Sequence, residues 1–181
     1  MFILYAGGIH FNLSTGVNVG LEKSTDYLLG EFEVKAYPTI TLDLKLGYRF
    51  TLNPRWFLDW NFFNLNLSPN FNLMDRHYLS LSVALLRFGT IINKWSVYGL
   101  IDPLCIQGII FMNRDVIKKS FSFGNNLGWG IAIGAGASYQ CLKYLSPNIE
   151  LQYRAKFTGQ FCQSFIGLIG IEVHSSKYSQ E

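Results

Sequence analysis

Residues 32–50 read FEVKAYPTITLDLKLGYRF, and apolar and polar side chains alternate along this stretch with a period of two. Such alternation predicts a β-strand whose two faces meet different surroundings. One face carries large aliphatic and aromatic side chains, while the other carries Asp43, Lys45 and Arg49. The stretch therefore predicts a sheet with one apolar and one charged face.

The same alternation recurs along the chain. It is clear at residues 149–157, and at 127–141 large odd-numbered residues alternate with very small even-numbered ones, which would leave room for bulky neighbours. The apolar parity slips between Phe62 and Phe63, which predicts a β-bulge. The eight expected strands are residues 3–21, 32–50, 56–67, 77–90, 95–111, 127–141, 149–157 and 165–173.

Composition decides which face points outward. Aromatic residues make up 16% and charged residues only 15% of the chain, against roughly 25% charged in ordinary soluble domains. The apolar side chains would overfill a narrow lumen, whereas outside they have unlimited room. A closed sheet also leaves no unpaired edge in hydrocarbon. We therefore expect an all-β fold, an eight-stranded antiparallel up-and-down transmembrane β-barrel over residues 1–173, followed by a short polar tail at 174–181.

The connectors between these strands support this fold, because they alternate between long and short as in outer-membrane barrels. The longer ones are expected at 22–29, 68–76 and 113–126, and the short ones at 53–55, 93–94, 143–148 and, as a short last outer loop, 159–163. Pro38 cannot donate a ladder hydrogen bond, so we expect either a bulge there or a membrane-distal strand end.

Two sets of side chains follow from the expected faces. Aromatic residues that bridge acyl chains and water form a lipid-facing girdle, which we assign to Tyr48, Trp56, Trp95, Tyr139 and Tyr153. A polar cluster is expected inside the lumen, and we interpret it as a rigid salt-bridged plug. A gated narrow pore is the alternative. The expected members are His10, Asp43, Lys45, Arg49, Asp59, Glu150, Arg154, Lys156 and Glu172.

Three stretches carry a resemblance to a known family: LKLGYRFTLNPRWFLDWNF, NKWSVYGLIDP and WGIAIGAGASYQCLKYLSPNIELQYRAKF, each of which predicts a strand, a tight turn and a strand. The pattern from Ile3 to Val173 resembles the OmpA-like and OmpX-like small outer-membrane barrels. The resemblance implies a bacterial outer-membrane location, contact with outer-membrane lipid and lipopolysaccharide, insertion by the barrel assembly machinery and a monomeric state. The last strand of such barrels typically ends in an aromatic residue, whereas the last expected strand of this chain ends at Val173.

Export and surface contact give two further expectations. The opening residues MFILYAGG have no basic n-region and a short apolar run, so we expect a signal peptide that was removed or a misassigned start. The segment Asn113–Asn126 carries Arg114, Lys118 and Lys119. This possible surface-binding loop could contact anionic lipopolysaccharide or a host surface.

From these features we expect a structural or surface-interaction role, meaning membrane integrity, adhesion or host contact.

Other functions have weaker support. The net charge of +3 comes from scattered basic residues, so no nucleic acid is expected. Cys105, Cys141 and Cys162 show no metal-ligand spacing, and we expect neither a metal nor a cofactor. His10 near Ser14 and His77 near Ser80 lie in no catalytic motif, so we expect no enzyme. A small lipid-modifying barrel enzyme and a soluble lipocalin-like carrier of an apolar ligand remain alternatives.

Overall fold

The computed structural model describes residues 5–25, 32–69, 76–112, 121–123, 127–157 and 162–175. The described residues contain no helix long and apolar enough to cross a membrane. They form ten antiparallel strands: β1 (Tyr5–Thr25), β2 (Phe32–Thr51), β3 (Trp56–Pro69), β4 (Arg76–Ser82), β5 (Leu85–Ile92), β6 (Trp95–Met112), β7 (Phe121–Phe123), β8 (Gly128–Tyr139), β9 (Leu145–Lys156) and β10 (Cys162–His174).

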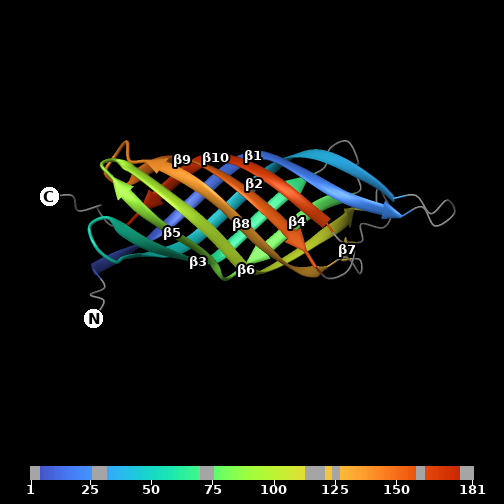
Figure 1. Ribbon diagram of the computed structural model, residues 1–181, viewed down its shortest axis with the longest axis horizontal. Helices are drawn as coiled ribbons and strands as arrows, with labels where there is room; N and C mark the ends of the chain where they lie inside the picture. The colour runs from blue at the N-terminus through green and yellow to red at the C-terminus, as the bar shows by residue number, and fades with distance from the viewer. Residues whose placement is uncertain are drawn as a thin grey trace.

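These strands close into a barrel with eight wall positions. β4 and β5 both lie between β3 and β6, and β7 pairs with β6 beyond the end of β8, so each of these pairs of strands shares one position. β1 pairs with β2 on one side and with β10 on the other, which closes the sheet (Figure 1). The eight-stranded transmembrane-type barrel predicted from the sequence is confirmed for the described part of the chain.

The two ends of the barrel differ. At one end, the turn end, short connectors join β2 to β3, β5 to β6 and β8 to β9, and β10 finishes beside the start of β1 (Figure 1). The two-residue connector Asn93–Lys94 has Asn93 at a φ of 55°, a left-handed conformation that asparagine tolerates in tight hairpins. The opposite end is the loop end.

The strand bounds differ from the prediction at several places. β1 extends to Thr25, into the connector expected at 22–29, β7 lies within the connector expected at 113–126, and β10 begins at Cys162, within the connector expected at 159–163. The connector expected at 143–148 is wrong, because β9 begins at Leu145. Pro147 lies near the start of that strand, opposite Ile171, where a missing donor is tolerated. The strand expected at 77–90 is interrupted at Val83 and Ala84, between β4 and β5. Pro38 stays in register with Val19 of β1, so no bulge forms there, and it lies inside β2 beyond the last β2–β3 pair.

The predicted bulge at Phe62 is confirmed. Leu46 pairs with Phe63 and Gly47 pairs with Asn61, so Phe62 is an extra residue in β3. Two further irregularities lie in the neighbouring wall positions, at Val83–Ala84 and at Pro103–Leu104 in β6. The three form a row across adjacent strands, and we call this row the bulge row.

The barrel is apolar outside and polar inside. Side chains such as Leu151, which is 65% exposed, and Ile169, which is 62% exposed, cover the outer face, while Lys45, Asp59 and Arg87 are fully buried. A soluble carrier would have the reverse arrangement, with an apolar cavity. The lipocalin-like alternative is therefore wrong, and the outer face suits a hydrocarbon environment.

Candidate functional site

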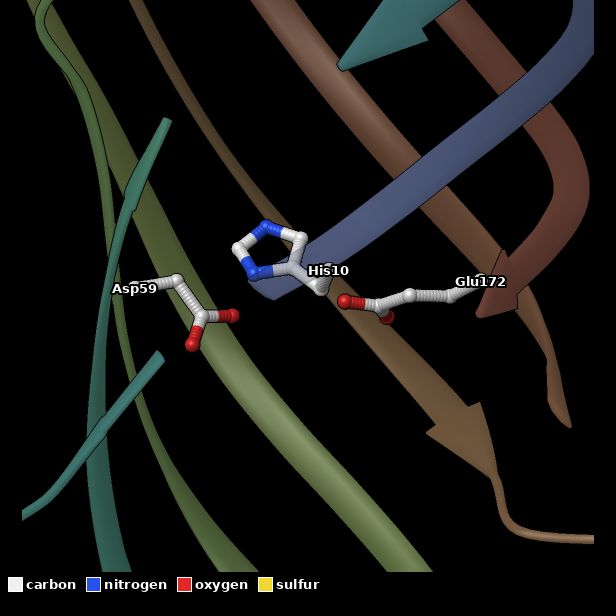
Figure 2. Close-up of side chains that lie close together, drawn as sticks. All are labelled: His10, Asp59 and Glu172. Atoms are coloured by element: carbon white, nitrogen blue, oxygen red, sulfur yellow. The ribbon is translucent and has the colours of Figure 1, made fainter. Parts of the chain in front are cut away.

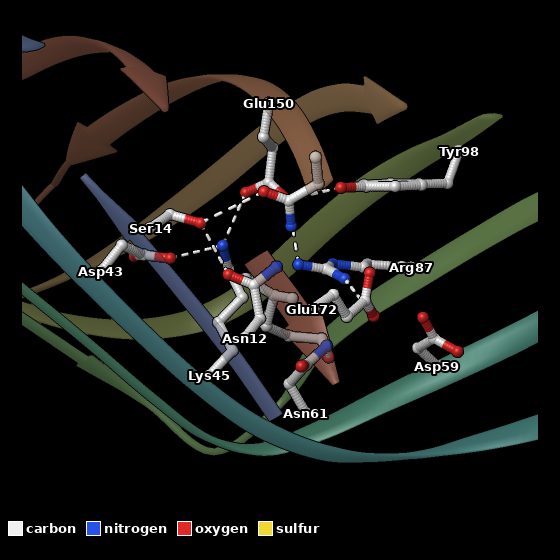
Figure 3. Close-up of polar contacts among 12 residues, drawn as sticks. Asn12, Ser14, Asp43, Lys45, Asp59, Asn61, Arg87, Tyr98, Glu150 and Glu172 are labelled. Carbon is white, nitrogen blue, oxygen red and sulfur yellow. Dashed lines mark hydrogen bonds and ion pairs between the residues drawn. The ribbon is translucent and has the colours of Figure 1, made fainter. Parts of the chain in front are cut away.

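The structure places all nine residues of the expected polar cluster in the barrel interior, each with at most 5% of its surface exposed. They reach the interior because alternate residues of β1, β2, β3, β9 and β10 point inward. The sequence analysis missed Arg87 and Tyr98, which also point inward from β5 and β6. Figure 3 shows polar contacts around Arg87, with Lys45, Tyr98, Glu150 and Glu172 among the side chains drawn.

Arg87 is the centre of the network. Its Nη1 lies 3.2 Å from Oε1 of Glu172, and its Nη2 lies 3.1 Å from Oε2 of Glu150. β5 and β10 occupy opposite wall positions of the eight, so the pair with Glu172 crosses the lumen. The Arg87 guanidinium also lies 4.8 Å from the centre of the Tyr98 ring. One side chain therefore joins strands on opposite walls.

A first group of partners surrounds Glu150. Lys45 Nζ donates to its Oε1 over 2.8 Å and also pairs with Asp43. The Tyr98 hydroxyl donates to Oε2 over 3.1 Å, and the Gln152 amide donates to Oε1. Because both oxygens of this buried carboxylate have charged or polar donors, its charge is well compensated.

A second group surrounds Asp59. Arg49 donates through Nε and Nη2 to the two oxygens of Asp59, each over 2.6 Å, which is the bidentate geometry that guanidinium and carboxylate favour. Arg49 also lies 3.4 Å from Glu172 and 4.0 Å from the centre of the Phe57 ring. Phe57 belongs to a small apolar cluster inside the lumen with Leu85, Tyr98 and Leu100.

His10, Asp59 and Glu172 converge beside this second group, with possible ligand atoms within 4.8 Å of one another (Figure 2). His10 Nε2 donates to Asn61 Oδ1 over 2.9 Å. The two carboxylates are the acceptors of the Arg49 and Arg87 guanidiniums, so a metal ion would have to compete with two fixed cations. This geometry favours an ion-pair cluster over a metal centre.

Of the two serine–histidine pairs considered from the sequence, His10 with Ser14 does not form, and the His77 side chain of the other lies outside the described part of the structure. Ser14 Oγ donates to Asn12 Oδ1 over 2.6 Å, whereas His10 bonds to Asn61. His174 also lies inside the barrel, since β10 extends through it, and its Nε2 is 3.9 Å from Glu172. Within the described residues, the histidines of the interior therefore belong to the ion-pair network.

Arg154 and Lys156 lie at the edge of this network, toward the loop end of β9. Arg154 donates through Nε and Nη2 to Gln152 Oε1, over 2.9 and 2.6 Å, and its Nη2 is 3.5 Å from Asp43. The loop-end half of the lumen therefore has a cationic wall.

The expected girdle residues face outward. Trp95 and Tyr139 are a cross-strand pair beside the turn end, with ring centres 5.0 Å apart, and Tyr48 and Trp56 lie in the same half. Tyr153 instead packs on Phe165 near the loop-end part of β9 and β10, with ring centres 5.1 Å apart. The expected surface-binding residues Arg114, Lys118 and Lys119 lie outside the described residues.

No protein-family model matches this sequence, and no curated protein is significantly similar to it. The fold does match solved structures. Neisserial surface protein A has a TM-score of 0.64 and 14% identity, covering 90% of this chain and 96% of that one. Ail, the attachment invasion locus protein of Yersinia pestis, has a TM-score of 0.51 and 15% identity, covering 91% and 97%.

The outer membrane protease OmpT from Escherichia coli has a TM-score of 0.51 at 7% identity, and the match covers 96% of this chain and 99% of that one. A match at such low identity is evidence for a shared fold and not for a shared activity. The closed barrel, its apolar exterior and these likenesses lead to one conclusion. This chain has the fold of the small OmpA-like and OmpX-like barrels of the bacterial outer membrane.

Proposed function

We propose that this protein is a structural or surface-interaction barrel of the outer membrane, with a closed interior that conducts no solute. The observation that carries the proposal is the Arg87–Glu172 ion pair, which crosses the lumen at 3.2 Å between two fully buried side chains. An eight-stranded barrel has an interior that side chains can fill. A filled interior of this kind makes the barrel wall rigid.

The fold likeness to Ail supports the same general role, because that protein is named for attachment and invasion. In this proposal, outer-membrane lipid and lipopolysaccharide contact the apolar exterior, and the barrel assembly machinery inserts the chain as a monomer. Binding to an anionic surface would fall to Arg114, Lys118 and Lys119. Replacement of all three by glutamine should then weaken adhesion of cells to an anionic glycan surface.

Single-channel recording in planar bilayers tests the closed interior. We expect no conductance steps from the wild-type barrel. The double variant Arg87→Ser, Glu172→Ser removes both partners of the lumen-crossing pair and should produce steps, because the space they fill becomes available to water. Arg55→Ser, a change in the exposed turn between β2 and β3, is the control and should stay silent. Steady conductance from the wild type would refute the proposal.

A further inference from the structure

A second polar site lies in the loop-end half of the lumen, at the edge of the Arg87 network. It is a small cavity of about 30 Å³ between β1, β3, β4, β6, β9 and β10. Its lining includes Arg154, Lys156, Ser80 and Asn18, and the described residues that line it include no Asp or Glu. The wall of this cavity is therefore polar and cationic.

Arg154 offers this cavity an unused donor. The Arg154 side chain is only 3% exposed, and its Nε and Nη2 edge is occupied by Gln152. Nη1 has no hydrogen-bond partner among the described residues. A buried donor of this kind costs free energy unless something accepts from it, and the second edge of a guanidinium fits the oxygens of a tetrahedral oxyanion. The neighbouring Asp43 also pairs with Lys45, so it does not serve Arg154 alone.

Ser80 supplies a second donor on the same lining. It points inward from β4, is 6% exposed, and its Oγ has no partner among the described residues. Asn18 Oδ1 is likewise without a partner, although its Nδ2 donates to Ser68 over 2.9 Å. That oxygen is an acceptor, which suits a ligand that also carries a hydroxyl group. Hydrogen phosphate combines anionic oxygens with such a hydroxyl, and a phosphate monoester does so in its monoanionic form.

We propose that this cavity binds the phosphate group of a small soluble ligand, with Arg154 and Ser80 donating to its oxygens and Lys156 adding positive charge. The strands separate the cavity from the bilayer, so the ligand reaches it from water and not as a lipid headgroup. The inference does not depend on the proposed surface role, because it concerns the lumen and not the outer loops. Free phosphate and a phosphorylated small molecule share this chemistry.

Titration calorimetry on the full chain tests the site. The barrel is folded in a maltoside detergent, which contains no phosphate, and is titrated with inorganic phosphate and with glycerol 3-phosphate at constant ionic strength. We expect binding by the wild type, a loss of affinity of at least about tenfold in Arg154→Met, and a loss of about threefold to tenfold in Ser80→Ala. Binding of both probes assigns the site to phosphorylated small molecules, and binding of inorganic phosphate alone assigns it to the free ion.

Two controls separate a local effect from a general one. Ser146→Ala removes another buried serine hydroxyl, from β9 in the turn-end half, and Lys143→Gln removes an exposed charge near the same end. Both variants should bind phosphate as the wild type does. If Arg154→Met fails to fold, as judged by a heat-shifted band on a gel, Ser80→Ala decides. Absence of binding by the wild type, or wild-type affinity in Ser80→Ala, would overturn the proposal.

Discussion

Arg87 is the residue whose loss should damage this barrel most. The substitution Arg87→Met keeps a long side chain but removes the only cation that contacts both Glu150 and Glu172 among the described ion pairs. Removal of one partner from a buried ion pair costs about 3–5 kcal/mol in soluble proteins, because the remaining charge stays buried without compensation. We expect the free energy of unfolding to fall by about that amount.

The structure also predicts which carboxylate accounts for most of the lost stability. Glu150 keeps Lys45 at 2.8 Å and the Tyr98 hydroxyl at 3.1 Å. Glu172 keeps only longer contacts, with Arg49 at 3.4 Å and His174 at 3.9 Å. Neutralising Glu172 in the double variant Arg87→Met, Glu172→Gln should therefore recover at least about 1.5 kcal/mol. Neutralising Glu150 in the same background should recover less than about 0.5 kcal/mol.

Urea unfolding of the detergent-folded barrel, followed by tryptophan fluorescence, measures these differences. Arg55→Met makes the same chemical change in the exposed turn between β2 and β3, and should change stability by no more than about 0.5 kcal/mol. The reasoning would be refuted if Arg87→Met were as stable as Arg55→Met. Equal recovery from the two glutamine substitutions would refute the assignment of the loss to Glu172.

Three further outcomes are expected. Leu44→Arg, in the middle of the outer face of β2, should lower the free energy of unfolding from lipid vesicles by about 2–4 kcal/mol. Leu142→Arg, in the turn-end connector, should lower it by about 1 kcal/mol or less. Equal losses would contradict the outward assignment of Leu44. Gly136→Ala would place a Cβ 2.6 Å from an interior tyrosine ring and should cost about 1–3 kcal/mol by urea unfolding. The Cβ of Gly99→Ala would meet only the Gly134 carbonyl oxygen at 3.9 Å, an ordinary van der Waals contact, and this change should be neutral. Similar losses in both variants would show that the interior is not tightly packed. Addition of Zn²⁺ should leave the urea midpoint unchanged, because two arginines hold the nearby carboxylates, and a rise that disappears in His10→Gln would reveal a metal site instead.

Strand positions were predictable from the sequence because each inward residue is flanked by outward ones. In β2, a shift of one residue would place Asp43, Lys45 and Arg49 in hydrocarbon, so only one register is compatible with the pattern. The bulge at Phe62 was equally visible, since two adjacent phenylalanines break the alternation. The same logic located the inward charges of β9 and β10.

The partners of those charges were not predictable. Arg87 lies 63 residues from Glu150 and 85 from Glu172 along the chain, and which inward residues face each other across the lumen depends on the tilt and stagger of all the strands. Arg87 was also hidden by a parity change. Inward residues of β4 are even-numbered, at Ser80 and Ser82, while those of β5 are odd-numbered. A single uninterrupted strand over 77–90 would have placed Arg87 on the lipid face.

The bulge row explains how a barrel can change parity without leaving polar backbone groups unpaired in lipid. At Val83–Ala84, the Ala84 amide donates to the Ser82 hydroxyl over 3.2 Å, and Ser82 donates to Asp102 over 2.7 Å. The Leu104 amide, beside the bulge in β6, donates to the same Asp102 oxygen over 3.4 Å. The inward side chains of Ser82 and Asp102 thus accept hydrogen bonds from two backbone amides that the interrupted ladder leaves without a partner. An unpaired amide would cost several kcal/mol in hydrocarbon. The buried Asp102 carboxyl is therefore explained by the backbone of the wall, not by the chemistry of the lumen.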